Sequence, residues 1–143
     1  MNHSEQGLAF RRAFDQETPG VISTSGFINK RLWDLQVGLI NEESCEFLEA
    51  AELLFADPHC NIKRENVLKE LSDLVFVAYQ FAVAFGFDLD TALDRVFASN
   101  MSKLGEDGKP IYRADGKVLK GPNYAPPSLG GLYQRSKGES HAA

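Results

Sequence analysis

The sequence has few cysteines, no long apolar run and no excess of basic residues, and each absence excludes a class of protein. Its two cysteines, Cys45 and Cys60, fit neither a disulfide framework nor a Cys-x-x-Cys metal site, so we expect free thiols in a reducing, cytoplasmic compartment. Lys and Arg total 15 against 20 Asp and Glu, and the net charge of −5 disfavours nucleic acid or an anionic membrane as a partner. The longest apolar run, residues 74–87, is shorter than the roughly 20 residues that span a bilayer. The first residues also lack the basic and apolar regions of a signal peptide.

Glycine and proline are scarce in the centre of the chain, which favours long helices. Apolar residues recur at helical spacing, and the sequence predicts helices over 6–15, 27–55, 64–85 and 91–104. After Gly105, two Asp-Gly-Lys triplets surround short apolar segments and predict a loop or a small hairpin. We therefore expect an all-α domain over residues 1–129, followed by a mobile tail over 130–143.

The predicted helix that includes residues 74–85 is apolar on almost every side there, which means that more than one neighbour covers it. Four helices can hardly provide that cover alone, so we expect a helical bundle completed by oligomerisation, as a homodimer or homotetramer. Phe10 and Phe14 are expected in the core, and Trp33 in packing or in an oligomer contact. The alternative is base recognition, with stacking on these rings or on Tyr112 and with Gln36 or Asn29 at the base edge.

Carboxylates stand inside the apolar stripe of the second predicted helix and at the border of the apolar stripe of the third. Glu42, Glu43 and Glu46 form an E-E-x-x-E motif, and Glu70 and Asp73 form an E-x-x-D pair. At about 100° per residue, the first motif points in the same direction as an apolar stripe. That stripe consists of Ile28, Leu32, Leu35, Leu39, Ala50 and Leu53. Two neighbouring antiparallel helices can therefore turn their acidic groups toward one another.

Such a cluster favours a metal site. A buried, unpaired carboxylate costs several kcal/mol and clustered carboxylates repel one another, so the site must take up protons or bind cations. Oxygen ligands without His or Cys favour Mg²⁺ or Mn²⁺ over Zn²⁺. Two such ions about 3.5–4 Å apart can clamp a phosphoryl group and lower the pKa of an attacking water. The alternative is a solvated helix face, which is the interpretation we favour for Glu52.

Basic residues gather near the end of this acidic chain. They are Lys103, Lys109, Arg113, Lys117 and Lys120. Acidic metal ligands combined with such a segment suit a triphosphate, because metals hold the reacting phosphate and Lys or Arg neutralise the rest. The alternative is a solvated loop of mixed sign, since Glu106, Asp107 and Asp115 are interspersed.

Four motifs together resemble a known family. They are Glu42-Glu43-x-x-Glu46, Glu70-x-x-Asp73, Ser99-Asn100-Met101-Ser102-Lys103 and the string D-G-K-V-L-K-G-P-N from Asp115 to Asn123. Over residues 6–128 they are similar to the MazG-like branch of the all-α nucleoside triphosphate pyrophosphatases. The resemblance implies hydrolysis of a (deoxy)nucleoside triphosphate between its α and β phosphates, which yields the monophosphate and pyrophosphate, in a helical dimer or tetramer.

The resemblance also implies roles for individual residues. The implied ligands of two or three Mg²⁺ or Mn²⁺ ions are Glu43, Glu46, Glu70 and Asp73. Glu42 would orient or deprotonate the attacking water, or hold a further ion. The implied nucleotide contacts are Asn100 and Lys103, and the implied phosphate contacts are Lys117 and Lys120.

Several alternatives stay open. A deoxynucleotide such as dUTP or dGTP is the expected substrate, for pool cleansing or precursor supply. Within the same chemistry phosphoribosyl-ATP is the less favoured substrate, because the C-terminal lysine strings do not resemble those of the short histidine-pathway enzymes. A non-catalytic, nucleotide-binding helical oligomer is the alternative from another class of function. No catalytic triad is evident, because acidic neighbours of Cys45 argue against a nucleophilic thiolate, and we expect His3, His59 and His141 on the surface.

Overall fold

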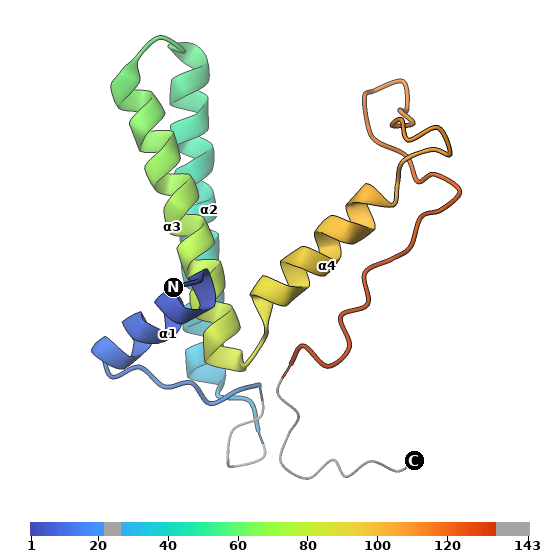
Figure 1. Ribbon diagram of the computed structural model, residues 1–143. Coiled ribbons are helices and arrows are strands. Elements are labelled where there is room, and N and C mark those ends of the chain that lie inside the picture. Colours follow the sequence, from blue (N-terminus) through green and yellow to red (C-terminus); the bar gives the residue numbers. More distant parts are fainter. Residues whose placement is uncertain (22–26, 134–143) are drawn as a thin grey trace, which may run out of the picture. The chain divides into compact units, whose positions relative to one another are not determined.

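The computed structural model describes residues 1–21 and 27–133, and over these residues it contains four helices and no strands (Figure 1). The helices are α1 (His3–Ala13), α2 (Lys30–Ala56), α3 (Asn61–Phe85) and α4 (Leu89–Met101). The predicted all-α class is confirmed. None of these helices has the length and apolar character needed to cross a membrane. Most of the predicted tail, residues 134–143, lies outside the described residues.

The chain divides into two compact units. Among the described residues, the first contains Met1–Phe87 together with Tyr133, and the second contains Asp88–Leu132. The first unit includes α1, α2 and α3, and the second includes α4 and the loop that follows it.

Side-chain caps set the helix ends more sharply than periodicity predicts. The Asn2 side chain accepts a hydrogen bond from Glu5 N at 2.8 Å, and the Glu5 carboxylate accepts one from Asn2 N, so α1 begins at His3. Asn29 caps α2 by accepting from Leu32 N at 3.1 Å. Gly86 ends α3 in a left-handed conformation with φ of 73°, which a residue without a side chain adopts at low cost.

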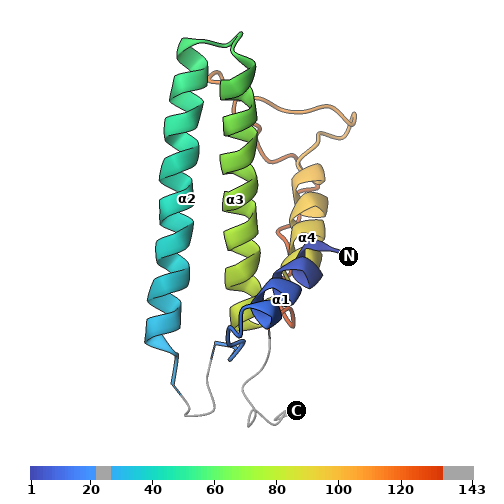
Figure 2. The same cartoon turned by 90° about the vertical axis from the view of Figure 1, so that its left-hand side faces the viewer.

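The core of the first unit is the antiparallel hairpin of α2 and α3, which lie side by side in Figures 1 and 2. Buried and half-buried residues of α2 follow a repeat of three and four: Trp33, Gln36, Ile40, Glu43, Phe47, Ala50 and Leu54. A matching repeat in α3 consists of Val67, Glu70, Leu74, Val77, Phe81 and Ala84. This spacing is typical of a coiled-coil seam, and we call these two rows the seam.

The predicted inward face of α2 is partly wrong. Leu35 and Leu53 are 56% and 57% exposed, and Ile28 is 40% exposed, because the predicted stripe lies beside the seam rather than on it. Only Ala50 belongs to both. The helix carries apolar residues on adjacent rows, and periodicity does not tell which row a neighbour covers.

α1 crosses the C-terminal half of α3 (Figure 2). The close approach depends on Gly7, where an added Cβ would lie 3.3 Å from the Val83 side chain. The Phe10 ring meets Phe76 edge to face at 5.3 Å between centroids. Phe14 is 64% exposed, so its predicted place in the core is wrong: it lies beyond the last turn of α1, where α3 no longer covers it. α1 and α2 therefore already cover the apolar part of α3 from two sides.

In the second unit, the loop after α4 folds back along that helix. Ser99 Oγ donates to the Ala125 carbonyl at 2.8 Å, and Gly121 N donates to the Lys103 carbonyl at 2.9 Å. Tyr112 and Val118 form a single antiparallel bridge, so the expected loop or small hairpin is a loop with one bridge.

Candidate functional site

Three glutamates from two helices converge in the first unit. Glu43 and Glu46 lie one turn apart on α2, and Glu70 lies on α3. Each offers a carboxylate oxygen, and these three oxygens lie within 4.8 Å of one another. The antiparallel hairpin brings the E-E-x-x-E and E-x-x-D motifs together, as the sequence analysis expects.

Glu43 has a carboxylate oxygen that is shielded from solvent. Its Oε2 atom reaches no solvent and has no hydrogen-bond partner within the described ranges. Burial raises the pKa of this carboxyl above its ordinary value of 4.5, and the negative charges of Glu46 and Asp73 raise it further. A buried carboxylate oxygen without a donor, among other carboxylates, is an arrangement that a hard cation completes. The donor set therefore fits the Mg²⁺ or Mn²⁺ ions expected from the sequence.

Asp73 joins the cluster through a lysine. Lys69 Nζ lies 2.9 Å from Glu70 Oε2 and 3.0 Å from Asp73 Oδ2. Asp73 is not one of the three carboxylates that lie within 4.8 Å of one another. Lys69 is not among the site residues predicted from the sequence, although its i,i+4 spacing to Asp73 is a recognisable signal of an ion pair.

The remaining acidic residues of α2 lie away from the seam. Glu42 is exposed beside the cluster, and its charge contributes to the raised pKa of Glu43. Glu52 is exposed, as expected. Cys45 is an exposed free thiol among these acidic residues, and Cys60 is a half-buried free thiol.

The four predicted nucleotide contacts belong to the second unit, whereas the carboxylates belong to the first. Lys103 Nζ donates to Asn100 Oδ1 at 2.6 Å, which joins two of the four. Lys120 Nζ lies 4.3 Å from the centre of the Tyr124 ring, in a cation–π contact. Lys117 is exposed and closes the 113–117 turn, where its carbonyl accepts from Arg113 N at 2.8 Å.

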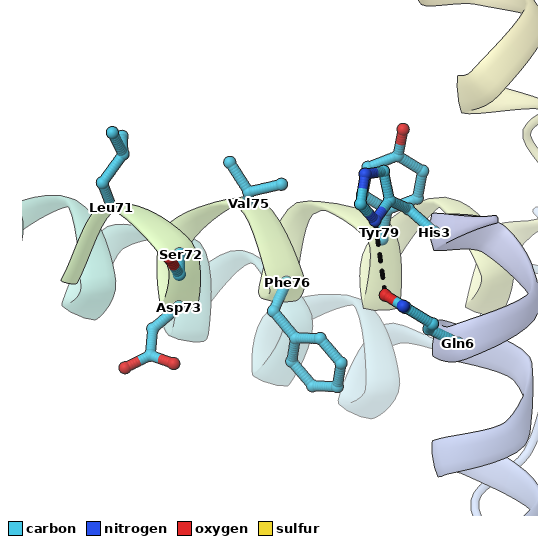
Figure 3. A pocket seen from close by; sticks show the side chains of 8 residues that line it. All are labelled: His3, Gln6, Leu71, Ser72, Asp73, Val75, Phe76 and Tyr79. Atoms are coloured by element: carbon cyan, nitrogen blue, oxygen red, sulfur yellow. Dashed lines mark hydrogen bonds between the residues drawn. The ribbon is translucent and has the colours of Figure 1, made fainter. Parts of the chain in front are cut away.

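An open groove of about 500 Å³ runs along the outer side of α3 to α1 (Figure 3). Its walls come from His3 and Gln6 of α1 and from Leu71, Ser72, Asp73, Val75, Phe76 and Tyr79 of α3. His3 Nδ1 and Gln6 Oε1 are 3.3 Å apart, and the His3 ring tilts against Tyr79. The groove is largely apolar with one acidic end at Asp73. His3 and His59 are exposed as predicted, and His141 lies outside the described residues.

A second pocket, of about 270 Å³, lies at the start of α2. Arg11, Asn29 and Gln36 are among the residues that line it. Arg11 Nη1 and Gln36 Oε1 are buried and have no hydrogen-bond partner in the described part of the chain. The rest of the Arg11 guanidinium donates to the Glu17 carbonyl. Trp33 packs on Phe81 and Phe85, so its expected packing role is confirmed, whereas Tyr112 is 61% exposed.

Comparisons with known proteins bear on the chemistry of this site. The sequence model of the family described as phosphoribosyl-ATP pyrophosphohydrolase matches residues 9–100. That range contains all the carboxylates of the two acidic motifs and ends before Lys103. A solved structure of a candidate NTP pyrophosphohydrolase from Exiguobacterium sp. 255-15 is 19% identical, with 89% of each chain covered and a TM-score of 0.42. No curated protein gives a significant match.

Proposed function

The chain belongs to the phosphoribosyl-ATP pyrophosphohydrolase family, and from that membership we propose that it cleaves a nucleoside triphosphate between its α and β phosphates. It is thus a pyrophosphohydrolase, a hydrolase that acts on phosphoric anhydrides. The observation that supports the proposed site is the convergence of Glu43, Glu46 and Glu70 inside the matched range, with one buried oxygen that receives no hydrogen bond from residues 1–21 or 27–133.

The proposed reaction needs positioning and charge neutralisation rather than a covalent nucleophile. Glu43, Glu46, Glu70 and Asp73 would hold two or three Mg²⁺ or Mn²⁺ ions, which when bound supply an attacking water of lowered pKa and neutralise the phosphates. Glu42 would orient this water and accept its proton. The water oxygen bonds to the α phosphorus as the bond to the bridging oxygen breaks, and pyrophosphate leaves.

There are two candidate substrates. The family match supports phosphoribosyl-ATP, which the sequence motifs favour less than a deoxynucleotide. A deoxynucleoside triphosphate such as dUTP or dGTP is the second candidate, and it is favoured by the D-G-K-V-L-K-G-P-N string, which lies beyond the matched range. In both cases Asn100, Lys103, Lys117 and Lys120 are proposed to contact the nucleotide and its phosphates.

The pocket at the start of α2 is the proposed place for the base. Gln36 and Glu43 are both seam residues of α2 and lie seven positions apart, which is a rise of about 10 Å along the helix. This is about the length of a nucleoside. Among the described residues, Gln36 Oε1 is an acceptor and Arg11 Nη1 a donor without a partner, and a base edge offers donors and acceptors to match them.

Product analysis tests the activity directly. The protein is incubated with phosphoribosyl-ATP, and separately with NTPs and dNTPs that include dUTP and dGTP, each with Mg²⁺ or Mn²⁺. We expect a monophosphate and pyrophosphate from one or two of these substrates, with Glu43→Gln as the inactive control. Release of inorganic phosphate instead of pyrophosphate would refute cleavage at the α–β bond. Nucleotide binding without turnover would favour the non-catalytic oligomer.

We also propose that the chain forms a homodimer or homotetramer. Large apolar side chains on α2 and α3 are exposed, which is typical of surfaces that associate. They include Leu35, Leu48, Leu53, Phe55, Ile62 and Leu68. Leu71 and Val75, which line the apolar groove of Figure 3, are also exposed on α3. A monomeric mass in analytical ultracentrifugation at micromolar concentration would refute the assembly.

A further inference from the structure

Lys69 is a cation already in contact with the proposed metal ligands. Its ammonium group lies 2.9 Å from a Glu70 oxygen and 3.0 Å from an Asp73 oxygen. The lysine side chain is 61% exposed, whereas that of Glu70 is only 10% exposed. A lysine on an exposed stem is protonated at neutral pH, so the group that contacts these two carboxylates is an ammonium cation.

The ammonium group and a divalent ion need the same oxygens. Mg²⁺ binds carboxylate oxygens at about 2.0–2.1 Å, and a cation held beside those oxygens repels a second cation through Coulomb's law. Because the Lys69 stem is flexible and exposed, its head group can rotate into water when the oxygens turn to a metal. An exposed lysine adds little desolvation cost to this exchange.

We propose that Lys69 is an exchangeable counter-ion of Glu70 and Asp73, which neutralises them in the metal-free protein and must leave before a divalent ion binds. The inference rests on the proposed function, because it takes these two carboxylates as metal ligands. Lys69 is then a positioning residue that sets metal affinity: it keeps the carboxylates ordered without metal, and it lowers the apparent affinity for the ion.

Calorimetric titration with Mn²⁺ alone, without nucleotide, tests this role. Lys69→Met keeps most of the apolar stem and removes the charge, and we expect it to bind Mn²⁺ roughly threefold to tenfold more tightly than the wild type. Lys69→Arg restores the charge and should return the affinity toward that of the wild type. Lys63→Met is the matched control, because Lys63 lies on the same helix and pairs with Asp57 at 3.3 Å. Its Mn²⁺ affinity should equal that of the wild type.

Thermal unfolding in EDTA and in saturating Mn²⁺ gives a second readout. We expect Lys69→Met to unfold at a lower temperature than the wild type in EDTA, because Glu70 and Asp73 lose their counter-ion, and to recover in Mn²⁺. A purely structural ion pair would lower both temperatures alike. Lys69→Gln provides an independent test if the methionine variant folds poorly.

The outcomes separate this inference from the proposed function. Equal or weaker Mn²⁺ binding by Lys69→Met would overturn the counter-ion role alone, while hydrolysis by the wild type would leave the proposed function intact. Absence of Mn²⁺ binding by the wild type would overturn the metal site and the counter-ion together. Tighter binding by Lys69→Met, with Lys63→Met unchanged, supports the exchange even if no tested nucleotide is hydrolysed.

Discussion

Substitution of Glu43 by glutamine should change stability in opposite directions with and without metal. Glutamine has nearly the same shape but carries no charge, so it removes the repulsion by Glu46 and Asp73 that raises the pKa of Glu43. In EDTA at neutral pH we therefore expect Glu43→Gln to be at least as stable as the wild type. Replacement of a buried charge by a neutral group of similar size is often stabilising.

The pH dependence has a definite sign. Because the folded pKa of Glu43 lies above 4.5, the folded chain keeps a proton that the unfolded chain releases between these two values. The retained proton stabilises the folded state at low pH. The free energy of unfolding of the metal-free wild type therefore falls as the pH rises from 4.5 through the folded pKa. Glutamine does not titrate, so the advantage of Glu43→Gln should be largest near pH 8 and vanish near about pH 4.

Bound metal should make the wild type more stable than Glu43→Gln, the reverse of the order expected in EDTA. A ligand present at 100 times its Kd stabilises the folded state by about 2.7 kcal/mol. Loss of a residue that hydrogen-bonds to a metal ligand weakens metal binding by about 10–100-fold. Loss of the ligand itself should therefore weaken binding by at least about 100-fold. At the same metal concentration, a 100-fold weaker site supplies only about 0.4 kcal/mol. The metal-induced gain should thus shrink by about 2 kcal/mol in Glu43→Gln.

Differential scanning calorimetry of both proteins, in EDTA and in Mn²⁺, measures this reversal. Glu52→Gln is the matched control, because Glu52 is exposed on the same helix, away from the seam. Its metal-induced gain should equal that of the wild type. If Glu43→Gln kept the full gain in Mn²⁺, Glu43 would not be a metal ligand, and the assignment built on its buried oxygen would be wrong.

Two further substitutions test the packing. Phe85→Ala should destabilise the chain by about 3–5 kcal/mol in denaturant unfolding, because Phe85 is fully buried against Trp33. Phe97→Ala, at an α4 position that is 65% exposed and outside the proposed association surface, is its control, and an equal loss would contradict the described core. Gly121→Ala should loosen the loop after α4. We expect the free energy of opening that protects its amides from hydrogen exchange to fall by about 1–3 kcal/mol. The added Cβ would stand 2.3 Å from the Leu104 carbonyl oxygen, and unchanged exchange would show that the loop runs elsewhere.

Local chemistry predicts the helices of this chain well. Apolar periodicity finds all four helices of the described residues, and residues such as Gly86 and Asp88 mark where they end or begin. What periodicity does not give is the side of α2 that α3 covers. That helix carries leucines on the row of Leu35 and Leu53, yet the row of Gln36 and Ala50 is the buried one. Burial depends on the partner helix, which a local pattern does not contain.

The candidate site is predictable to a different degree. The carboxylates are found because acidic residues in an apolar pattern demand an explanation, and the antiparallel hairpin then brings Glu43, Glu46 and Glu70 together. Lys69 is missed because a lysine next to a glutamate on a helix is ordinarily a solvated residue. Its significance follows only from the position of Glu70 on the seam, which makes Lys69 a counter-ion to a buried charge.

Glu43 and Glu70 occupy seam positions that elsewhere hold residues such as Ala50 and Val77. A coiled-coil seam with carboxylates in its middle gives up apolar contacts there and gains mutual repulsion. The hairpin would therefore be more stable without metal if Glu43 were leucine, and the chain keeps the glutamate at a cost in stability. Such a cost is expected where a site serves function, because a destabilised arrangement becomes the most stable one when the ligand binds. The long apolar seam on both sides of the cluster allows the hairpin to fold despite its acidic centre.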